Sequence, residues 1–343
     1  MRYQPALSVR TSIAVALLVS SAAALTWHYT STLTWPQHGD RVVLHDEIIA
    51  GEAVAPHRYR VLVPWAMELS IRALSTVIGR GGSFAAAYAM LDFIAMSAAL
   101  VLLYLYLRRW AADIVALVLT LFVTGTLSIT LQDHFFQPWS FPELAFFSLA
   151  LLLILDDRRW SLAALVVVAT LNRETGVFIP VAFALAFLSR DREAREAGGA
   201  LLSGAIWTGF YGAIWLALFV ALRVMLGTAE PHEPLSQTVA INMEPRWLVI
   251  AIIQLLLILG FGWVLAVRGL KSAPRFLRAM TLVLPLYLVP VLIWGRWTEI
   301  RLMLPMLPII LPLAAIALTR HVGTATPDEN NSNALDASPE VTE

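Results

Sequence analysis

The chain has 343 residues, of which 59% are apolar and only 14% are charged, whereas soluble domains carry about 25% charged residues. This balance excludes an ordinary soluble enzyme and fits a chain that lies mostly in a bilayer, since ten crossings of about 20 residues would use about 200 residues. The 24 basic and 24 acidic residues cancel, so nucleic acid is not expected as a partner, and the lack of cysteine excludes disulfides, thiolate metal sites and a cysteine nucleophile.

The first apolar run, residues 11–33, follows Arg2 and Arg10 and predicts an uncleaved first membrane helix. A cleaved signal peptide is the alternative interpretation, because Ala22 and Ala24 form a small-residue pattern. In both cases the segment that follows is expected outside the membrane.

Residues 35–82 are expected to form the first outer loop. Within this loop, residues 61–78 look helical and carry Glu68 and Arg72 at i,i+4 spacing. We expect them to lie on the membrane surface. Counting them as a crossing would invert everything downstream and place most later basic residues outside, which the positive-inside rule disfavours.

Eight further apolar runs follow, and one of them is interrupted by a polar stretch at residues 172–176, which predicts two short halves that form a hairpin. The sequence thus predicts an all-α, polytopic transmembrane bundle of about ten crossings. Residues 1–320 form its single domain, residues 321–343 form a disordered cytoplasmic tail, and both termini are cytoplasmic. The eight runs are residues 83–107, 114–131, 139–155, 161–188, 200–222, 247–267, 279–294 and 302–319.

Carboxylates and arginines alternate in the first outer loop. A carboxylate near the membrane surface can take a proton from an attacking hydroxyl or hold a divalent cation such as Mg or Mn, and an arginine fork can bind a phosphate. These groups suit a reaction with a phosphate leaving group, and a solvated loop with salt bridges is the alternative. The residues are Asp40, Asp46, Glu47, Arg58, Tyr59 and Arg60.

The polar interruption of the hairpin contains Asn172, Arg173 and Glu174. Ionisable side chains between two apolar half-helices cost several kcal/mol unless they face water, a partner or a ligand. We therefore expect them to line a cavity, with a structural polar knot between helices as the alternative.

Two other outer loops hold candidate residues. Asp133 and His134 are candidates for a general base pair or metal ligands, with structural capping as the alternative. The last outer loop carries Arg296, Glu299 and Arg301, although positive charge is disfavoured outside. Binding of an anion explains this exception, and interfacial anchoring explains it almost as well.

This layout resembles the GT-C superfamily of polytopic glycosyltransferases, which take a sugar from a polyprenyl-phosphate carrier on the outer side of the membrane. The pair Asp46 and Glu47 is similar to the acidic pair of the first outer loop in that superfamily, and residues 61–78 to its surface-lying helices. The strings at residues 59–64 and 172–175 are similar to those of related bacterial membrane proteins. The large soluble domain of many members is lacking here.

The resemblance implies a bacterial inner-membrane enzyme, active on the periplasmic face, that uses a polyprenyl-phosphate sugar and an unknown acceptor. Asp46 would deprotonate the acceptor hydroxyl, and Glu47 would orient Asp46 or bind the cation. Five arginines would hold the donor phosphate, and the sugar would be transferred with inversion. These are Arg58, Arg60, Arg173, Arg296 and Arg301.

Three other functions remain open from the sequence. A transporter or flippase of a lipid phosphate is suggested by the interrupted hairpin, because broken helices often mark binding sites at the bilayer midplane. The second alternative is a membrane acyltransferase with His134 or His57 as its base. The third is a non-catalytic assembly factor.

Overall fold

The computed structural model describes residues 9–34, 38–130, 138–189, 200–231 and 234–323, and within these ranges every named element is a helix. Helix α1 (Val9–Tyr29) continues into one π-helical turn (Thr30–Thr34), and the short helix α2 (His38–Ala50) follows. A 3₁₀ turn η2 (His57–Tyr59) leads into the long helix α3 (Leu62–Leu107). The predicted all-α architecture is therefore confirmed for the described residues.

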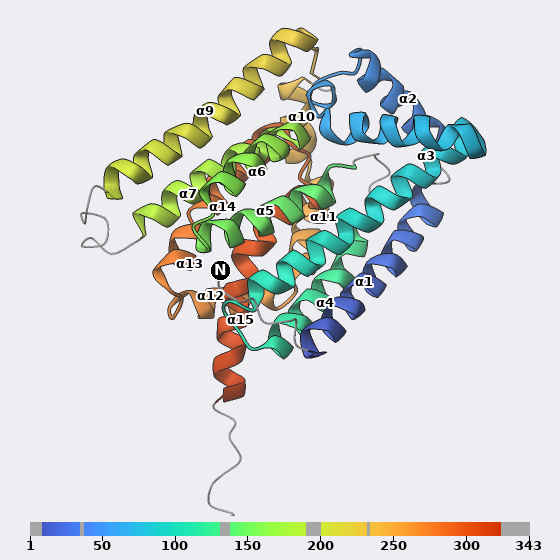
Figure 1. Cartoon of the computed structure of the whole chain (residues 1–343). Helices are drawn as coiled ribbons and strands as arrows, with labels where there is room; N and C mark the ends of the chain where they lie inside the picture. The colour runs from blue at the N-terminus through green and yellow to red at the C-terminus, as the bar shows by residue number, and fades with distance from the viewer. Residues whose placement is uncertain (1–8, 35–37, 131–137, 190–199, 232–233, 324–343) are drawn as a thin grey trace, which may run out of the picture.

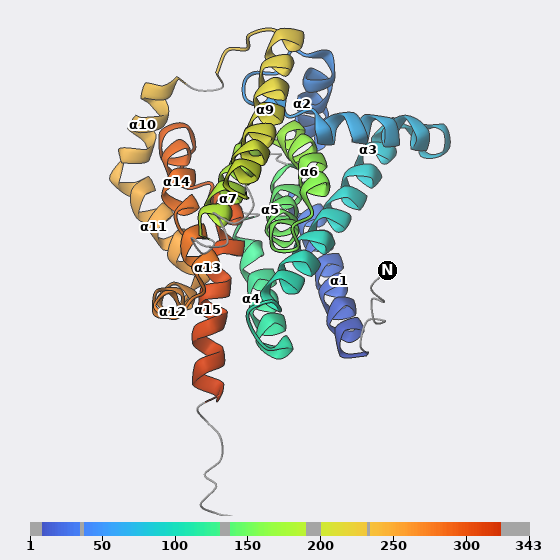
Figure 2. The same ribbon diagram turned by 60° about the vertical axis from the view of Figure 1, so that its left-hand side comes forward.

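Helix α3 consists of two helices joined at Gly79. This residue has φ of 71° and ψ of 163°, a region that is almost closed to residues with a Cβ. The first half therefore turns away from the second half and runs across one end of the bundle together with α2 (Figures 1 and 2). The bend sets residues 62–78 apart from the second half of α3, and their expected place on the membrane surface stays a prediction.

The rest of the chain forms the body of the bundle, in which α5 packs against α3, α6 and α7 and is buried along most of its length. Helix α9 crosses α6 and α7 on one side (Figure 1). The elements are α4 (Asp113–Thr130), α5 (Ser140–Leu155), α6 (Arg159–Asn172), η3 (Glu174–Val177), α7 (Phe178–Leu188), α9 (Ala200–Leu226), α10 (Leu235–Met243), α11 (Pro245–Leu259), α12 (Gly262–Leu270), α13 (Arg275–Met280), α14 (Val283–Trp294), η5 (Ile300–Met306) and α15 (Leu307–Gly323).

The expected number of ten crossings is not confirmed. In the described ranges six helices are long and apolar enough to cross a membrane, or seven if the bent pair α10 and α11 forms one span. Counting α5, α6 and the η3–α7 segment as well would give ten, but each of these has at most 17 residues. Such helices are shorter than the roughly 20 residues that a full crossing needs.

Apolar side chains on the outside of the bundle are widely exposed, among them Phe261, Val267 and Trp294. A soluble protein would bury such residues, whereas lipid is their natural surroundings in a membrane. The long apolar helices are consistent with a multi-pass membrane protein.

Candidate functional site

The predicted interruption between the hairpin halves is present, and its backbone explains how α6 ends. Arg173 is extended, with φ of −164° and ψ of 147°, so the helix stops at Asn172 and the chain turns through η3 into α7. A Cβ on Gly176 would lie 3.0 Å from the backbone nitrogen of Thr170, a tight contact, so a larger residue would push the turn away from α6. The polar side chains of the turn are thereby held among the helices.

Arg173 and Glu143 form a buried ion pair inside the bundle. The Arg173 Nη1 donates to Glu143 Oε2 at 2.5 Å, and the two side chains are only 5% and 3% exposed. Thr175 donates its hydroxyl to the other oxygen of Glu143. Because Glu143 lies in the first turn of α5, this pair joins the hairpin interruption to the beginning of the central helix.

Arg60 brings the first outer loop to the same place. Its Nε lies 3.3 Å from Glu174 Oε2, and its carbonyl accepts a hydrogen bond of 3.1 Å from the Trp139 indole. Burial lowers the pKa of the Arg60 guanidinium from its ordinary value, and the carboxylate of Glu174 opposes this shift. The guanidinium nevertheless stays charged, as arginine does in proteins. The structure thus unites two segments 114 residues apart.

We call this group the buried polar cluster. It consists of Arg60, Glu143, Asn172, Arg173, Glu174 and Thr175, and Asn172 is anchored in it by a hydrogen bond of 3.1 Å from its Nδ2 to the Trp139 carbonyl. The cluster brings together polar residues that are far apart along the chain, and the cavity that the sequence analysis expects them to line stays a prediction.

Arg301 is also buried, on an element that packs against α5. Its Nη2 is 3.0 Å from Glu299 Oε2, and η5, which carries it, packs against α5. The neighbouring Leu302 carbonyl accepts a hydrogen bond of 2.8 Å from Tyr287, on which the charges of Glu143, Arg173 and Arg60 act. Arg301 therefore precedes a residue that binds Tyr287, on which the charges of the cluster act.

Buried guanidinium groups in this region have unused donors. Arg173 Nε and Arg301 Nε are both buried, and neither has a hydrogen-bond partner among the described residues. Buried N–H groups are nearly always paired in folded proteins, and leaving one on a charged group unpaired costs 1–3 kcal/mol or more. Two such donors on arginines are what a site for an anionic ligand would present.

Arg58 and Tyr59 do not join the buried polar cluster. Arg58 donates its Nε to the Ala53 carbonyl at 2.8 Å and its Nη1 to the Thr228 carbonyl at 3.2 Å. Tyr59 donates to the Gly227 carbonyl at 3.0 Å. Both side chains therefore fasten the first outer loop to the segment after α9.

Asp46 and Glu47 do not meet the cluster in the structure either. Helix α2 buries Arg41, His45 and Ile48 on one face, so Asp46 and Glu47 point outward and are exposed. The Asp46 carboxylate pairs instead with Arg80 Nη2 at 2.5 Å, and these side chains are 49% and 60% exposed. The catalytic roles expected for this acidic pair stay predictions.

The remaining predicted residues are scattered. Asp40 is exposed at the beginning of α2, and Arg296 is half-buried between α14 and η5. Asp133 and His134 lie outside the described residues. No group of three or more histidine, aspartate or glutamate side chains suited to a metal ion occurs in the part of the chain that the structure describes.

Sequence reasoning missed three buried ionisable residues. Asp92 is the single charged residue of its apolar run at residues 83–107, which is itself a signal of function. Glu143 lies close to an expected helix start, and Arg41 would share a face with His45 if residues 38–50 were expected to be helical. Each could have been found by asking which charged residues cannot face lipid and therefore need a buried partner.

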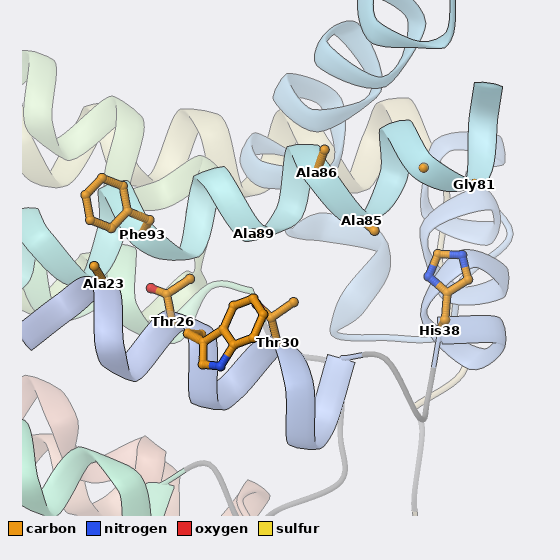
Figure 3. Close-up of a pocket in the computed structure, with 11 residues that line it drawn as sticks. Ala23, Thr26, Thr30, His38, Gly81, Ala85, Ala86, Ala89 and Phe93 are labelled. Atoms are coloured by element: carbon orange, nitrogen blue, oxygen red, sulfur yellow. The ribbon is translucent and has the colours of Figure 1, made fainter. Parts of the chain in front are cut away.

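A groove of about 820 Å³ runs between α1 and the second half of α3. Figure 3 shows its alanine-rich wall on α3, with Thr26 on α1, Thr30 in the π-helical turn that follows, and His38 near one end. Its lining is mostly apolar, as a hydrocarbon chain would require, and its volume lies in the range of ligand sites. The groove passes the C-terminal end of α1, where Tyr29 is buried.

Comparison with models of known protein families, with curated proteins and with solved structures gives no match for this chain.

Proposed function

We propose that this chain is a membrane glycosyltransferase that takes a sugar from a polyprenyl-phosphate donor and transfers it to an acceptor on the side where α2 and the first half of α3 lie. The observation that carries the proposal is the pair of buried, unpaired guanidinium donors, Arg173 Nε and Arg301 Nε, at the end of the bundle. They supply positive charge where a lipid phosphate would develop negative charge as it leaves.

The groove between α1 and α3 supports a lipid-linked donor over a soluble one. Its apolar lining suits a prenyl chain, and it runs alongside the helix end that holds Tyr29. A water-soluble sugar nucleotide would gain nothing from such a groove.

The test uses purified protein in liposomes, with a panel of polyprenyl-phosphate hexoses and pentoses and bacterial membrane extract as the acceptor source. We expect free polyprenyl phosphate to be released from at least one donor, and Arg301→Ala to lose both this release and the binding of polyprenyl phosphate, followed by tryptophan fluorescence. Arg80→Ala is the matched control, because Arg80 is exposed. Wild-type protein that releases nothing from any donor contradicts the proposal.

A second candidate, a transporter of a lipid phosphate, is favoured by one specific observation. Helices α10 and α11 form a second broken segment, bent by 76° near Glu244, whereas the sequence indicated an interruption only in the hairpin. The break is fastened by Asn242, which donates to the Gly295 carbonyl at 2.8 Å and accepts from the Trp297 amide at 3.0 Å. Two broken segments are typical of transporters, and movement of polyprenyl phosphate across proteoliposomes without sugar release would decide for this function.

A further inference from the structure

Two pairs of polar side chains connect α2 to the second half of α3. Arg41 and His45 lie one turn apart on α2, and Tyr88 and Asp92 lie one turn apart on α3. His45 Nδ1 is 2.9 Å from the Tyr88 hydroxyl. With this pair in place Arg41 comes opposite Asp92, and its charge acts on the Asp92 carboxylate. All four side chains are buried.

Tyr29 connects these two pairs to the proposed phosphate site. Its hydroxyl accepts a hydrogen bond of 2.8 Å from Arg41 Nη2, and the charges of Asp92 and Arg301 both act on it. Its ring packs edge-on against Phe141, two residues before Glu143. Because Tyr29 is the last residue of α1 and the charge of Asp92 acts on it, the Asp92 carboxylate lies near the end of that helix.

Asp92 differs from the other buried carboxylates of the described residues. Glu68 accepts from Arg72 at 2.7 Å, and Glu143 accepts from Arg173 and Thr175. No described residue donates a hydrogen bond to the Asp92 carboxylate, which is only 4% exposed. A buried carboxylate on an apolar helix, without a donor among the described residues, is a candidate for function by default.

We propose that Asp92 is the general base of the reaction, with Arg41 and Tyr29 as its positioning residues; this rests on the proposed function. The Asp92 carboxylate takes the proton of the acceptor hydroxyl as the acceptor oxygen forms a bond to the anomeric carbon. The bond from that carbon to the phosphate oxygen breaks, and its electron pair leaves with the polyprenyl phosphate, beside Arg301. The sugar is inverted, and the proton stays on Asp92 until solvent removes it.

The assignment predicts that transfer depends on Asp92 although donor binding does not. Asp92→Asn should lower release of polyprenyl phosphate from the active donor about 100-fold or more, the usual contribution of a general base. The affinity for polyprenyl phosphate itself should be unchanged. Asp113→Asn is the matched control, because Asp113 pairs with Arg108 at the other end of α3 and is half exposed.

Two further variants separate a base from a structural role. In Asp92→Ala, sodium azide should restore release and form a glycosyl azide, because azide attacks the anomeric carbon without losing a proton. Asp92→Glu, which keeps the carboxylate, should regain part of the activity. Thermal denaturation in detergent checks that each variant folds.

The assignment would be overturned if Asp92→Asn released polyprenyl phosphate at the rate of the wild-type protein. It would also be overturned if Asp92→Asn lost both release and binding of polyprenyl phosphate, and if neither azide added to Asp92→Ala nor the Asp92→Glu variant restored release. That result would indicate a structural role. Loss of release in Asp46→Asn with full release in Asp92→Asn would return the base to the exposed acidic pair. If wild-type protein uses no donor at all, the proposed function itself fails.

Discussion

The buried polar cluster and the outer face of α2 contain the same kinds of residue in very different surroundings. Glu143 and Arg173 pair inside the bundle, whereas Asp46 and Arg80 pair in the open, each at 2.5 Å. Water and salt screen the exposed pair, but nothing screens the buried one. The comparison teaches that an acidic pair in an outer loop is weaker evidence of a site than a single charge within an apolar segment.

The strongest test of this contrast removes the carboxylate at the centre of the buried pair. Glu143→Ala leaves Arg173 charged and buried and Thr175 without its acceptor, so we expect a loss of about 3–5 kcal/mol in the free energy of unfolding. Denaturation in mixed micelles measures it. The double variant Glu143→Ala/Arg173→Met should recover much of the loss, and a single variant as stable as wild type would contradict the buried pair.

The bend between the two halves of α3 depends on one glycine. Gly79→Ala forces a side chain into a conformation with φ of 71°, which should cost about 1–3 kcal/mol. A Cβ there meets no other atom within 4 Å, so the cost is in the backbone alone. Gly125→Ala is the control, since this helical glycine in α4 also has open space and should be neutral or slightly stabilising in the same thermal denaturation.

A smaller effect is expected where α2 attaches to the bundle. Tyr88→Phe removes the hydroxyl that contacts His45 at 2.9 Å and should cost about 1 kcal/mol of stability, the usual worth of a hydrogen bond. Hydrogen exchange should then rise in α2 and not in α5. If hydrogen exchange in α2 is the same in Tyr88→Phe as in the wild-type protein, the contact does not hold α2.

The smallest effect is expected at the exposed pair. Asp46→Asn should change the free energy of unfolding by no more than about 0.5 kcal/mol, as for other surface pairs. A loss comparable to that of Glu143→Ala would remove the distinction between the two regions. Thermal denaturation of both variants in one detergent makes the comparison direct.

Helix positions could be predicted where apolar runs end in charged or polar residues. The runs at residues 114–131 and 139–155 match α4 and α5 within a residue or two. The run at residues 247–267 was expected to be one crossing, but it breaks at Gly260 into α11 and α12. Hydrophobicity continues across the break, so the apolar pattern does not reveal it.

The candidate site could be predicted in part. Glu174 and Arg173 required partners because an apolar segment cannot leave them unpaired, and the structure supplies Arg60 and Glu143. Which partner each would take depends on tertiary packing that no local pattern records. The acidic pair at Asp46 and Glu47 can be found in the sequence, but its exposure depends on which face of α2 is buried, and that again is set by tertiary packing.

The attachment of the first outer loop to the segment after α9 bears on how the chain is made. The Tyr59 hydroxyl and the Arg58 guanidinium bind carbonyls about 170 residues later, and Ala55 bridges Pro231. During synthesis these contacts cannot form until α9 and the residues that follow it have been made. The loop is therefore among the first parts of the chain to be made but among the last to gain its final contacts.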